Sequence, residues 1–217
     1  MLEFKNICFR FGEKEILKDF SFSADEGIST AILGPSGFGK TTLMNLAAGF
    51  IKPQNGNIVP FSGQKVSYIF QDDRLLPWFT ALENLTAVGI DKSKAEEYLA
   101  KVGLSDSSDK YPDELSGGMQ RRLAIARALA FGGDTFFFDE TLRGLDVKTA
   151  EDILGLIRSE TSGKTAFIIT HSPKEAFLLC DRIVFVGENP LKILFDKKKT
   201  DFADENELLE YIKNITA

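Results

Sequence analysis

The residues with the clearest chemical purpose lie in a glycine-rich stretch, residues 34–42, which reads Gly-Pro-Ser-Gly-Phe-Gly-Lys-Thr-Thr. An apolar run at 30–33 precedes it and a helix-like pattern follows, which is the context that a phosphate-binding loop requires. Gly34, Gly37 and Gly39 allow the backbone to wrap with its N–H groups pointing inward. The N-terminus of the following helix also favours an anion. The stretch therefore predicts a site for a nucleoside triphosphate.

Side chains in the same stretch are suited to the outer phosphates and to a magnesium ion. Lys40 supplies a positive charge, and the Thr41 hydroxyl can be a ligand of Mg²⁺. We expect the nucleotide to lie against the whole stretch, which also contains Pro35, Ser36, Phe38 and Thr42. The alternative interpretation is a surface loop that contains Gly-Lys-Thr by coincidence. The loop alone does not say what the energy of the nucleotide is used for.

Two carboxylates end an apolar run at residues 135–138. An acidic pair at the end of a strand is commonly only solvated, but a phosphate loop earlier in the chain gives it a purpose. Asp139 can hold Mg²⁺ through water, and Glu140 can orient or deprotonate an attacking water molecule.

A second anion site is predicted where Ser116, Gly117 and Gly118 begin a helix. The serine hydroxyl can cap the helix, and the glycines leave its free N–H groups accessible. A chain with one nucleotide site does not need a second phosphate-binding helix end. We therefore expect this one to contact a nucleotide that is bound to another molecule.

Composition limits the class of protein. The chain has 217 residues, a net charge of −6 and 43% hydrophobic residues, which are typical of a globular domain and argue against a large nucleic-acid footprint. Cys8 and Cys180 have no metal-ligand spacing, so we expect free thiols in a reducing cytoplasm. Neither a signal peptide nor an apolar run long enough to span a membrane is apparent.

Hydrophobic periodicity predicts an α/β fold with a mostly parallel core sheet. An antiparallel β subdomain is expected at the N-terminus, and an α-helical subdomain is expected to be inserted at about 72–132. Capping boxes are predicted at Ser93 and Ser172. The expected strands are 2–11, 20–24, 29–33, 66–70, 135–138, 165–170, 182–186 and 191–195. The expected helices are 42–50, 93–102, 116–132, 147–158, one after Ser172 and one over 208–215.

These motifs and their order resemble the ATP-binding-cassette (ABC) ATPases, whose fold is that of P-loop nucleoside triphosphatases. Residues 34–41 resemble the Walker A motif of that family, and residues 115–120 resemble its signature. Residues 136–140 are similar to the Walker B motif with its catalytic glutamate. Gln71 falls at the Q-loop, residues 144–146 at the D-loop, and His171 at the switch histidine. The resemblance covers essentially the whole chain, as one nucleotide-binding domain, 1–217.

The resemblance implies a site that two copies of the chain share, paired head to tail. Each ATP would lie between the Walker A loop of one copy and the signature helix of the other. Thr41 and Gln71 would approach Mg²⁺, Glu140 would polarise water, and His171 would support the γ-phosphate. The signature residues Ser116 and Gly118 would contact the partner's γ-phosphate.

Phe11 matches the aromatic residue that stacks on adenine in this family. The alternatives are that Phe9 takes this role, or that Phe11 is a core residue of an edge strand.

Several positions depart from the family pattern. Phe38 replaces a small loop residue, Thr141 replaces a proline, and Ser172 replaces a common aspartate. Arg143 and Gly144 replace a typical Ser-Ala pair, which bears on communication across the dimer. The distance from Gly56 to Gln71 is also short for the family, so a trimmed β-hairpin is expected.

The segment 74–78, Arg-Leu-Leu-Pro-Trp, resembles the nitrate/sulfonate/taurine group of bacterial importers. An exposed apolar patch around Trp78 would suit a groove that receives a helix of a membrane partner. The alternative is that Leu75, Trp78 and Phe79 form the core of the helical subdomain. The resemblance implies import of a small anionic solute, a separate permease and an extracytoplasmic solute-binding protein. It also implies a place on the cytoplasmic face of the cell membrane.

Two other classes of protein fit the sequence less well. A non-transport ABC ATPase of the DNA-repair or chromosome-organising type would carry a long coiled-coil insertion, but no heptad run lies between Lys40 and Leu115. A small-molecule kinase with a phosphate loop would have no use for the signature at 115–120.

Overall fold

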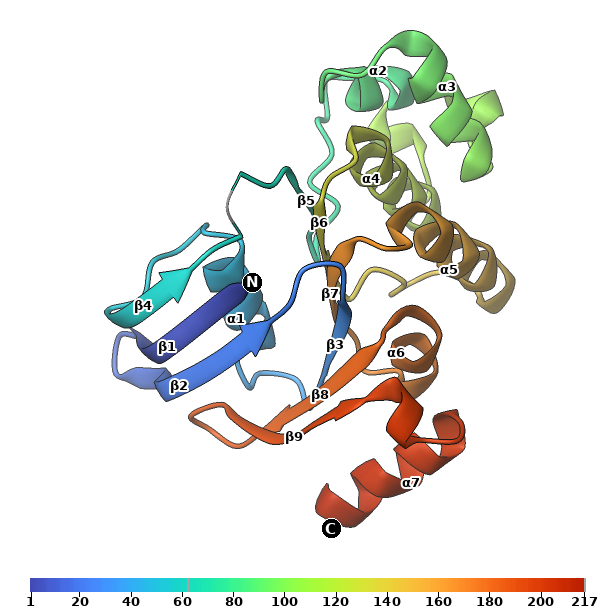
Figure 1. The fold of residues 1–217 in the computed structure, drawn as a ribbon. Coiled ribbons are helices and arrows are strands. Elements are labelled where there is room, and N and C mark those ends of the chain that lie inside the picture. The colour runs from blue at the N-terminus through green and yellow to red at the C-terminus, as the bar shows by residue number, and fades with distance from the viewer. Residues whose placement is uncertain (62, 217) are drawn as a thin grey trace. The chain divides into compact units, whose positions relative to one another are not determined.

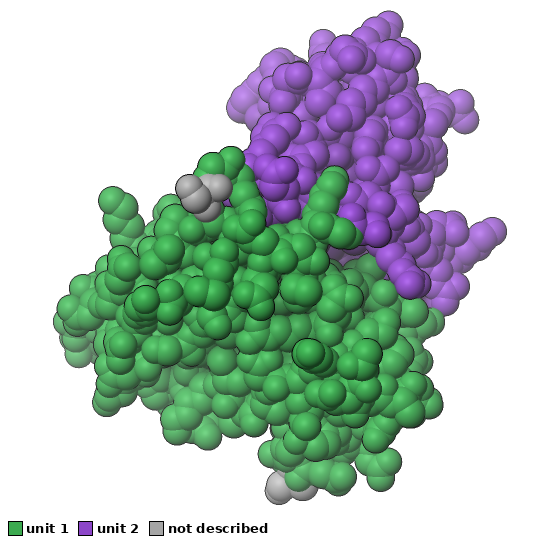
Figure 2. All heavy atoms as spheres, in the orientation of Figure 1, with its two compact units in different colours: residues 1–64, 163–217 green, residues 65–162 purple. Residues whose placement is uncertain are grey.

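A computed structural model describes residues 1–61 and 63–216. The chain forms two compact units, coloured green and purple in Figure 2. Unit 1 is residues 1–64 and 163–217, and unit 2 is residues 65–162. No helix within the described residues is long and apolar enough to cross a membrane.

An antiparallel sheet of order β2-β1-β4 forms one part of unit 1 (Figure 1). Its strands are β1 (Leu2–Phe11), β2 (Lys14–Ala24) and β4 (Asn55–Val59). Alternate apolar residues of β1 and β2 are buried, as their spacing predicts. However, β2 begins earlier than expected, and β4 was not predicted because Gly56 looked like a chain break. Gly56 has φ +87°, and a Cβ there would lie 2.4 Å from the carbonyl oxygen of Asn6, so the glycine permits close strand contact.

The other sheet strands of unit 1 are ordered β7-β3-β8-β9. They are β3 (Ser29–Leu33), β7 (Thr165–Ile169), β8 (Arg182–Gly187) and β9 (Lys192–Lys198). β3 pairs in parallel with both β7 and β8, while β9 is antiparallel to β8. Every residue of β3 and β7 is buried, which explains their continuous apolar runs. The segments that follow β3 and β7 therefore leave the sheet at the same edge.

The helices of unit 1 are α1 (Lys40–Ala47), α6 (Pro173–Leu179) and α7 (Glu205–Thr216), with a short 3-10 turn at Lys199–Asp201. Helix α1 begins and ends two to three residues earlier than predicted, because Gly49 (φ +76°) ends the helical path. The predicted cap of α6 is confirmed, since Ser172 Oγ accepts from Glu175 N at 3.2 Å. The reciprocal half of that capping box is absent, because the Glu175 carboxylate accepts from the Thr170 hydroxyl instead.

Unit 2 pairs two parallel strands and carries four helices (Figure 1). The strands are β5 (Val66–Ile69) and β6 (Thr135–Asp139). The helices are α2 (Ala81–Thr86), α3 (Lys92–Lys101), α4 (Gly117–Phe131) and α5 (Val147–Thr161), with 3-10 turns at Ser105–Ser107 and Pro112–Glu114. Helix α4 packs against α2 and α3, and most of its residues from Arg121 to Ala130 are buried.

Helix α3 corrects one sequence-based prediction. Its N-cap is Asp91, whose Oδ1 accepts from Lys94 N at 2.8 Å, so Ser93 lies inside the helix and the predicted capping box there is wrong. Aspartate and serine are both strong caps, and two candidates two residues apart compete for the same turn. By contrast, the predicted Ser116 cap of α4 is confirmed.

Candidate functional site

The loop between β3 and α1 takes a path that only glycine permits at two positions. Gly34 has φ +152°, and a Cβ there would lie 2.2 Å from the carbonyl oxygen of Val186. Gly39 has φ +93°, and its Cβ would lie 2.5 Å from Ile16 Cγ2. Because real Cβ contacts are never this short, the sheet and the loop can pack together only with glycine at both ends of the loop.

Lys40 is almost completely buried at the start of α1, with 5% of its surface exposed. Its Nζ donates to the carbonyl oxygens of Gly34 at 2.8 Å and Pro35 at 2.7 Å. The neighbouring loop residues Pro35, Ser36 and Gly37 are exposed, as is Thr41, whereas Phe38 and Thr42 are half-buried. A fixed ammonium group beside an exposed glycine loop and a helix N-terminus is an arrangement that binds phosphate.

His171 lies next to this loop. It is the second residue after β7 and is exposed, and its Nε2 is 3.3 Å from Ser36 Oγ. The parallel pairing of β3 with β7 accounts for this contact, because both segments leave the same edge of the sheet. Unit 1 therefore brings the predicted Walker A residues and the predicted switch histidine together.

The acidic pair ends β6 in unit 2. Asp139 is buried, and Glu140 is half-buried with its Oε2 3.5 Å from Arg143 Nη1. Arg143 is largely exposed, so this ion pair is weak. Glu140 has φ +48°, a left-handed conformation that costs a non-glycine residue about 1–2 kcal/mol. Backbone strain of this kind persists only where the surroundings impose it.

Tyr68, on β5, interacts electrostatically with Asp139. Burial, and next the negative charge of Asp139, raise the pKa of the Tyr68 phenol far above its ordinary value. The phenol is therefore neutral at physiological pH.

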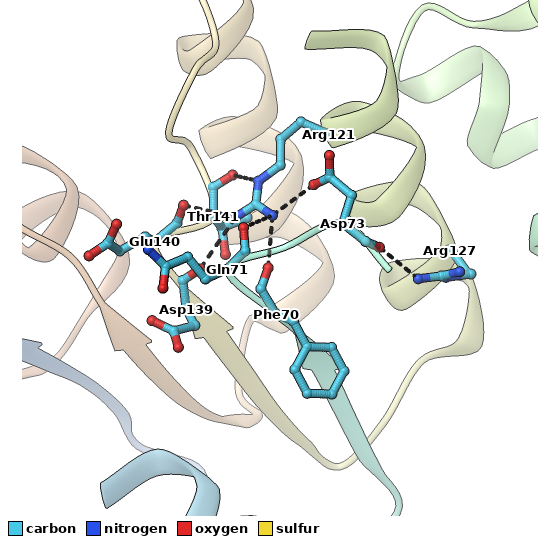
Figure 3. A network of polar contacts seen from close by, with 8 residues as sticks. All are labelled: Phe70, Gln71, Asp73, Arg121, Arg127, Asp139, Glu140 and Thr141. Atoms are coloured by element: carbon cyan, nitrogen blue, oxygen red, sulfur yellow. Dashed lines mark hydrogen bonds and ion pairs between the residues drawn. The ribbon is translucent and has the colours of Figure 1, made fainter. Parts of the chain in front are cut away.

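Arg121 is a residue of this site that the sequence analysis missed (Figure 3). It lies on α4 with 4% of its surface exposed, and its guanidinium group donates to the main-chain carbonyls of the acidic pair, of Thr141 directly after the pair, and of Phe70 directly after β5. Gln71, which is exposed, belongs to the same cluster through its carbonyl oxygen. The available signal was the run at 123–131, apolar except for Arg127, that begins two residues after Arg121, because an arginine beside a stretch that must be buried needs buried partners.

The start of α4 is presented to solvent. Ser116 and Gly117 are exposed, and Ser116 Oγ accepts from Met119 N at 3.4 Å. A Cβ at Gly117 would have no neighbour within 4 Å, and one at Gly118 would make only an ordinary contact with Leu145 at 3.9 Å. The packing of this chain therefore does not explain why both positions are glycine.

Two exposed aromatic residues lie where the sequence predicts contacts with other molecules. Phe11 is 57% exposed, whereas Phe9 is buried and packs edge-on against it with ring centroids 4.9 Å apart. Trp78 is 68% exposed, while Leu75 and Phe79 are half-buried. Of these three residues, Trp78 is thus not part of the core of unit 2.

Comparison with known proteins identifies the family. Residues 17–143 match the ABC transporter family. The chain belongs to this family. The taurine import ATP-binding protein TauB of Jannaschia sp. (strain CCS1) is 36% identical to this ABC chain over 238 residues, which cover 98% of the chain and 88% of that protein. The protein of the same name from Pseudomonas aeruginosa is 36% identical over 220 residues, covering 94% and 83%.

Solved structures agree. A dimeric post-hydrolysis state of the ATP-binding cassette MJ0796, bound to ADP and Pi, has a TM-score of 0.81 and 29% sequence identity, and covers 92% of this chain and 99% of that chain. An ATP-binding subunit of another ABC transporter has a TM-score of 0.85 at 21% identity, which supports the fold alone. The predicted family and α/β fold are confirmed, and this ABC chain is an ATP-binding and ATP-hydrolysing protein.

Thr141, which follows the acidic pair, leads to a stability prediction. Its side chain is buried and its Oγ1 has no hydrogen-bond partner among the described residues. Replacing an unpaired buried hydroxyl with a methyl group of similar size removes a desolvation cost, so Thr141→Val should raise the free energy of unfolding by about 1 kcal/mol. Urea denaturation of the nucleotide-free protein measures this change.

Thr161→Val is the matched control. Thr161 is also buried, but its Oγ1 donates to the carbonyl oxygen of Ile157 at 2.8 Å, so its replacement should lower the free energy of unfolding by about 1 kcal/mol. If both substitutions destabilise the protein equally, the Thr141 hydroxyl is paired.

Proposed function

We propose that this ABC ATPase powers the import of a small anionic solute such as taurine, nitrate or a sulfonate. The observation that carries the proposal is similarity along almost the whole chain to proteins named for taurine import. In this proposal, residues 1–217 form one nucleotide-binding domain, with 72–132 as its helical subdomain. The domain lies on the cytoplasmic face of the membrane against a separate permease, and an extracytoplasmic protein supplies the solute.

ATP binds with its phosphates against the loop at 34–42. The glycines that the packing requires have no side chains to cover the N–H groups of the loop, and Lys40 adds a fixed positive charge. When bound, Mg²⁺ neutralises phosphate charge during hydrolysis. The Thr41 hydroxyl, Gln71 and the buried Asp139 are the residues suited to hold it, because Mg²⁺ prefers oxygen ligands, water and substrate phosphates over a dedicated protein cage.

Glu140 is the general base in this proposal. It follows the buried Asp139 directly, and its left-handed backbone sets the direction of its side chain. Its carboxylate orients the attacking water and accepts its proton, and His171 beside Ser36 supports the γ-phosphate.

Two copies of the chain complete each site. Gly117 and Gly118 begin a 15-residue helix at an exposed end where side chains would fit without clashes. A second molecule that approaches this end explains the missing side chains, because phosphate can then reach the free N–H groups and Ser116. The dimeric structure of a related cassette supports this arrangement. The exposed Phe11 then stacks on adenine, since Phe9 is buried.

The segment around Trp78 is the proposed contact with the permease. Asn84 is fully buried, and its side chain accepts from Leu76 N at 2.8 Å and donates to the carbonyl oxygens of Leu76, Phe79 and Thr80. These bonds fix the loop that carries Trp78, so the indole is exposed on an ordered support. Aromatic anchors of this kind contribute strongly to protein interfaces.

Replacing the proposed base tests the catalytic assignment. Glu140→Gln keeps the size of the side chain but cannot accept the proton, so hydrolysis should slow by at least 100-fold while ATP binding is retained. Size-exclusion chromatography should then detect an ATP-dependent dimer that accumulates. Turnover near that of the wild type would show that another group is the base.

Trp78→Ala tests the permease contact. The substitution should leave the thermal midpoint and basal ATPase activity of the purified chain nearly unchanged, because Trp78 is exposed. It should sharply reduce the amount of membrane protein recovered with the tagged chain from solubilised membranes.

Leu209→Ala is the control for Trp78, since Leu209 is an exposed apolar residue on α7 in unit 1. This variant should recover membrane protein as the wild type does. A large loss of stability in Trp78→Ala, or equal recovery with both variants, would contradict the proposed contact.

A further inference from the structure

Arg121 uses all three of its nitrogen atoms on the segments that carry the proposed catalytic residues (Figure 3). Its Nε donates to the carbonyl oxygen of Thr141 at 2.6 Å, and its Nη2 donates to those of Glu140 at 2.8 Å and Asp139 at 3.3 Å. Three consecutive carbonyls thus converge on one cation. Such convergence bends the main chain, and the bend is at Glu140, whose φ is +48°.

The remaining nitrogen holds the segment after β5. Arg121 Nη1 donates to the carbonyl oxygens of Phe70 at 2.8 Å and Gln71 at 3.3 Å, and to Asp73 Oδ1 at 2.9 Å. Asp73 supplies the opposite charge that a buried guanidinium group requires. One side chain on α4 therefore connects the segment after β5 with the end of β6 and the two residues that follow it.

The strain at Glu140 explains why this connection matters. A non-glycine residue in the left-handed region stays there only when its surroundings impose it. The Arg143 side chain that contacts the Glu140 carboxylate is largely exposed and 3.5 Å away, so it holds this backbone weakly. Arg121 is buried and contacts the main chain directly on both sides of the strained residue.

We propose that Arg121 is a positioning residue for ATP hydrolysis, which imposes the strained backbone of Glu140 and fixes it relative to Gln71. The inference rests on the proposed role of Glu140 as the general base. The hydrogen bonds of Arg121 described above all go to residues of unit 2, whereas the phosphate loop belongs to unit 1, so its loss should affect the chemical step and leave nucleotide binding intact. A base displaced by about 1 Å can lose on the order of 100-fold in rate.

Two substitutions test the inference on the purified full chain. Arg121→Gln removes the guanidinium group, and kcat should fall on the order of 10- to 100-fold. The KM for ATP and the Kd for the fluorescent analogue mant-ATP should stay within about twofold of the wild-type values. The reason is that the substitution leaves unchanged the contacts that hold the nucleotide equally in the ground state and the transition state. Arg121→Lys keeps the positive charge opposite Asp73 but loses the planar guanidinium group with its several donors. This variant should therefore fold, and its kcat should lie between those of Arg121→Gln and the wild type.

Arg122→Gln is the matched control. Arg122 lies on the same helix and donates through Nη1 to the carbonyl oxygens of Val102 at 2.6 Å and Gly103 at 3.2 Å, away from the acidic pair. Its loss should lower the thermal midpoint without changing kcat by more than about twofold. If Arg122→Gln lowers kcat as much as Arg121→Gln does, or if kcat and mant-ATP binding fall together in Arg121→Lys, the role of Arg121 is only structural and the inference is overturned.

A double variant separates this inference from the proposed function. If Arg121 acts through Glu140, Arg121→Gln should slow the wild type but cause little further loss in a Glu140→Gln background. Slow Glu140→Gln together with normal turnover in both Arg121 variants would overturn the inference alone. Normal turnover in Glu140→Gln would overturn the proposed base and, with it, the inference.

Discussion

The wrapped backbone between β3 and α1 is the constraint on which the rest of unit 1 depends. Gly34 and Gly39 lie so close to Val186 and Ile16 that any side chain would force the loop away from the sheet. Lys40 closes the loop by donating to two of its carbonyl oxygens. The loop is held from both sides by its own packing and hydrogen bonds, which reduces the entropy that phosphate binding costs.

Unit 2 also contains a strained backbone, but it is stabilised in a different way. The chain turns directly after β6, where Asp139 is the last residue of the strand and Glu140 is the first residue of the turn. Directly after β6 the left-handed conformation falls on Glu140 and not on a glycine; Gly144, which also has a positive φ, comes four residues later. A buried arginine and the carbonyls around it supply the stabilisation that a glycine would supply elsewhere, while the carboxylate is retained.

Local sequence patterns predicted the phosphate loop, the parallel strands β3 and β7 and the Ser116 cap, because each depends on residues close together in the chain. β4 was missed, because its glycine is explained only by contact with a distant strand. The cap of α3 was misplaced, because Asp91 and Ser93 are equally suited by type. The role of Arg121 was not predicted, since its partners come from two segments, 70–73 and 139–141, that are far apart in the sequence.

The exposed start of α4 supports the central claim that each ATP site is shared between two copies. Chains with Lys40→Ala, which lack the phosphate charge, and chains with Gly118→Asp, which repel phosphate at the signature helix, should each hydrolyse little ATP alone. Mixed dimers contain one site built from two unaltered halves, so the hydrolysis rate should rise to a maximum near an equal mixture. A rate that stays at the sum of the two separate variants at every ratio would show that each site lies within one chain.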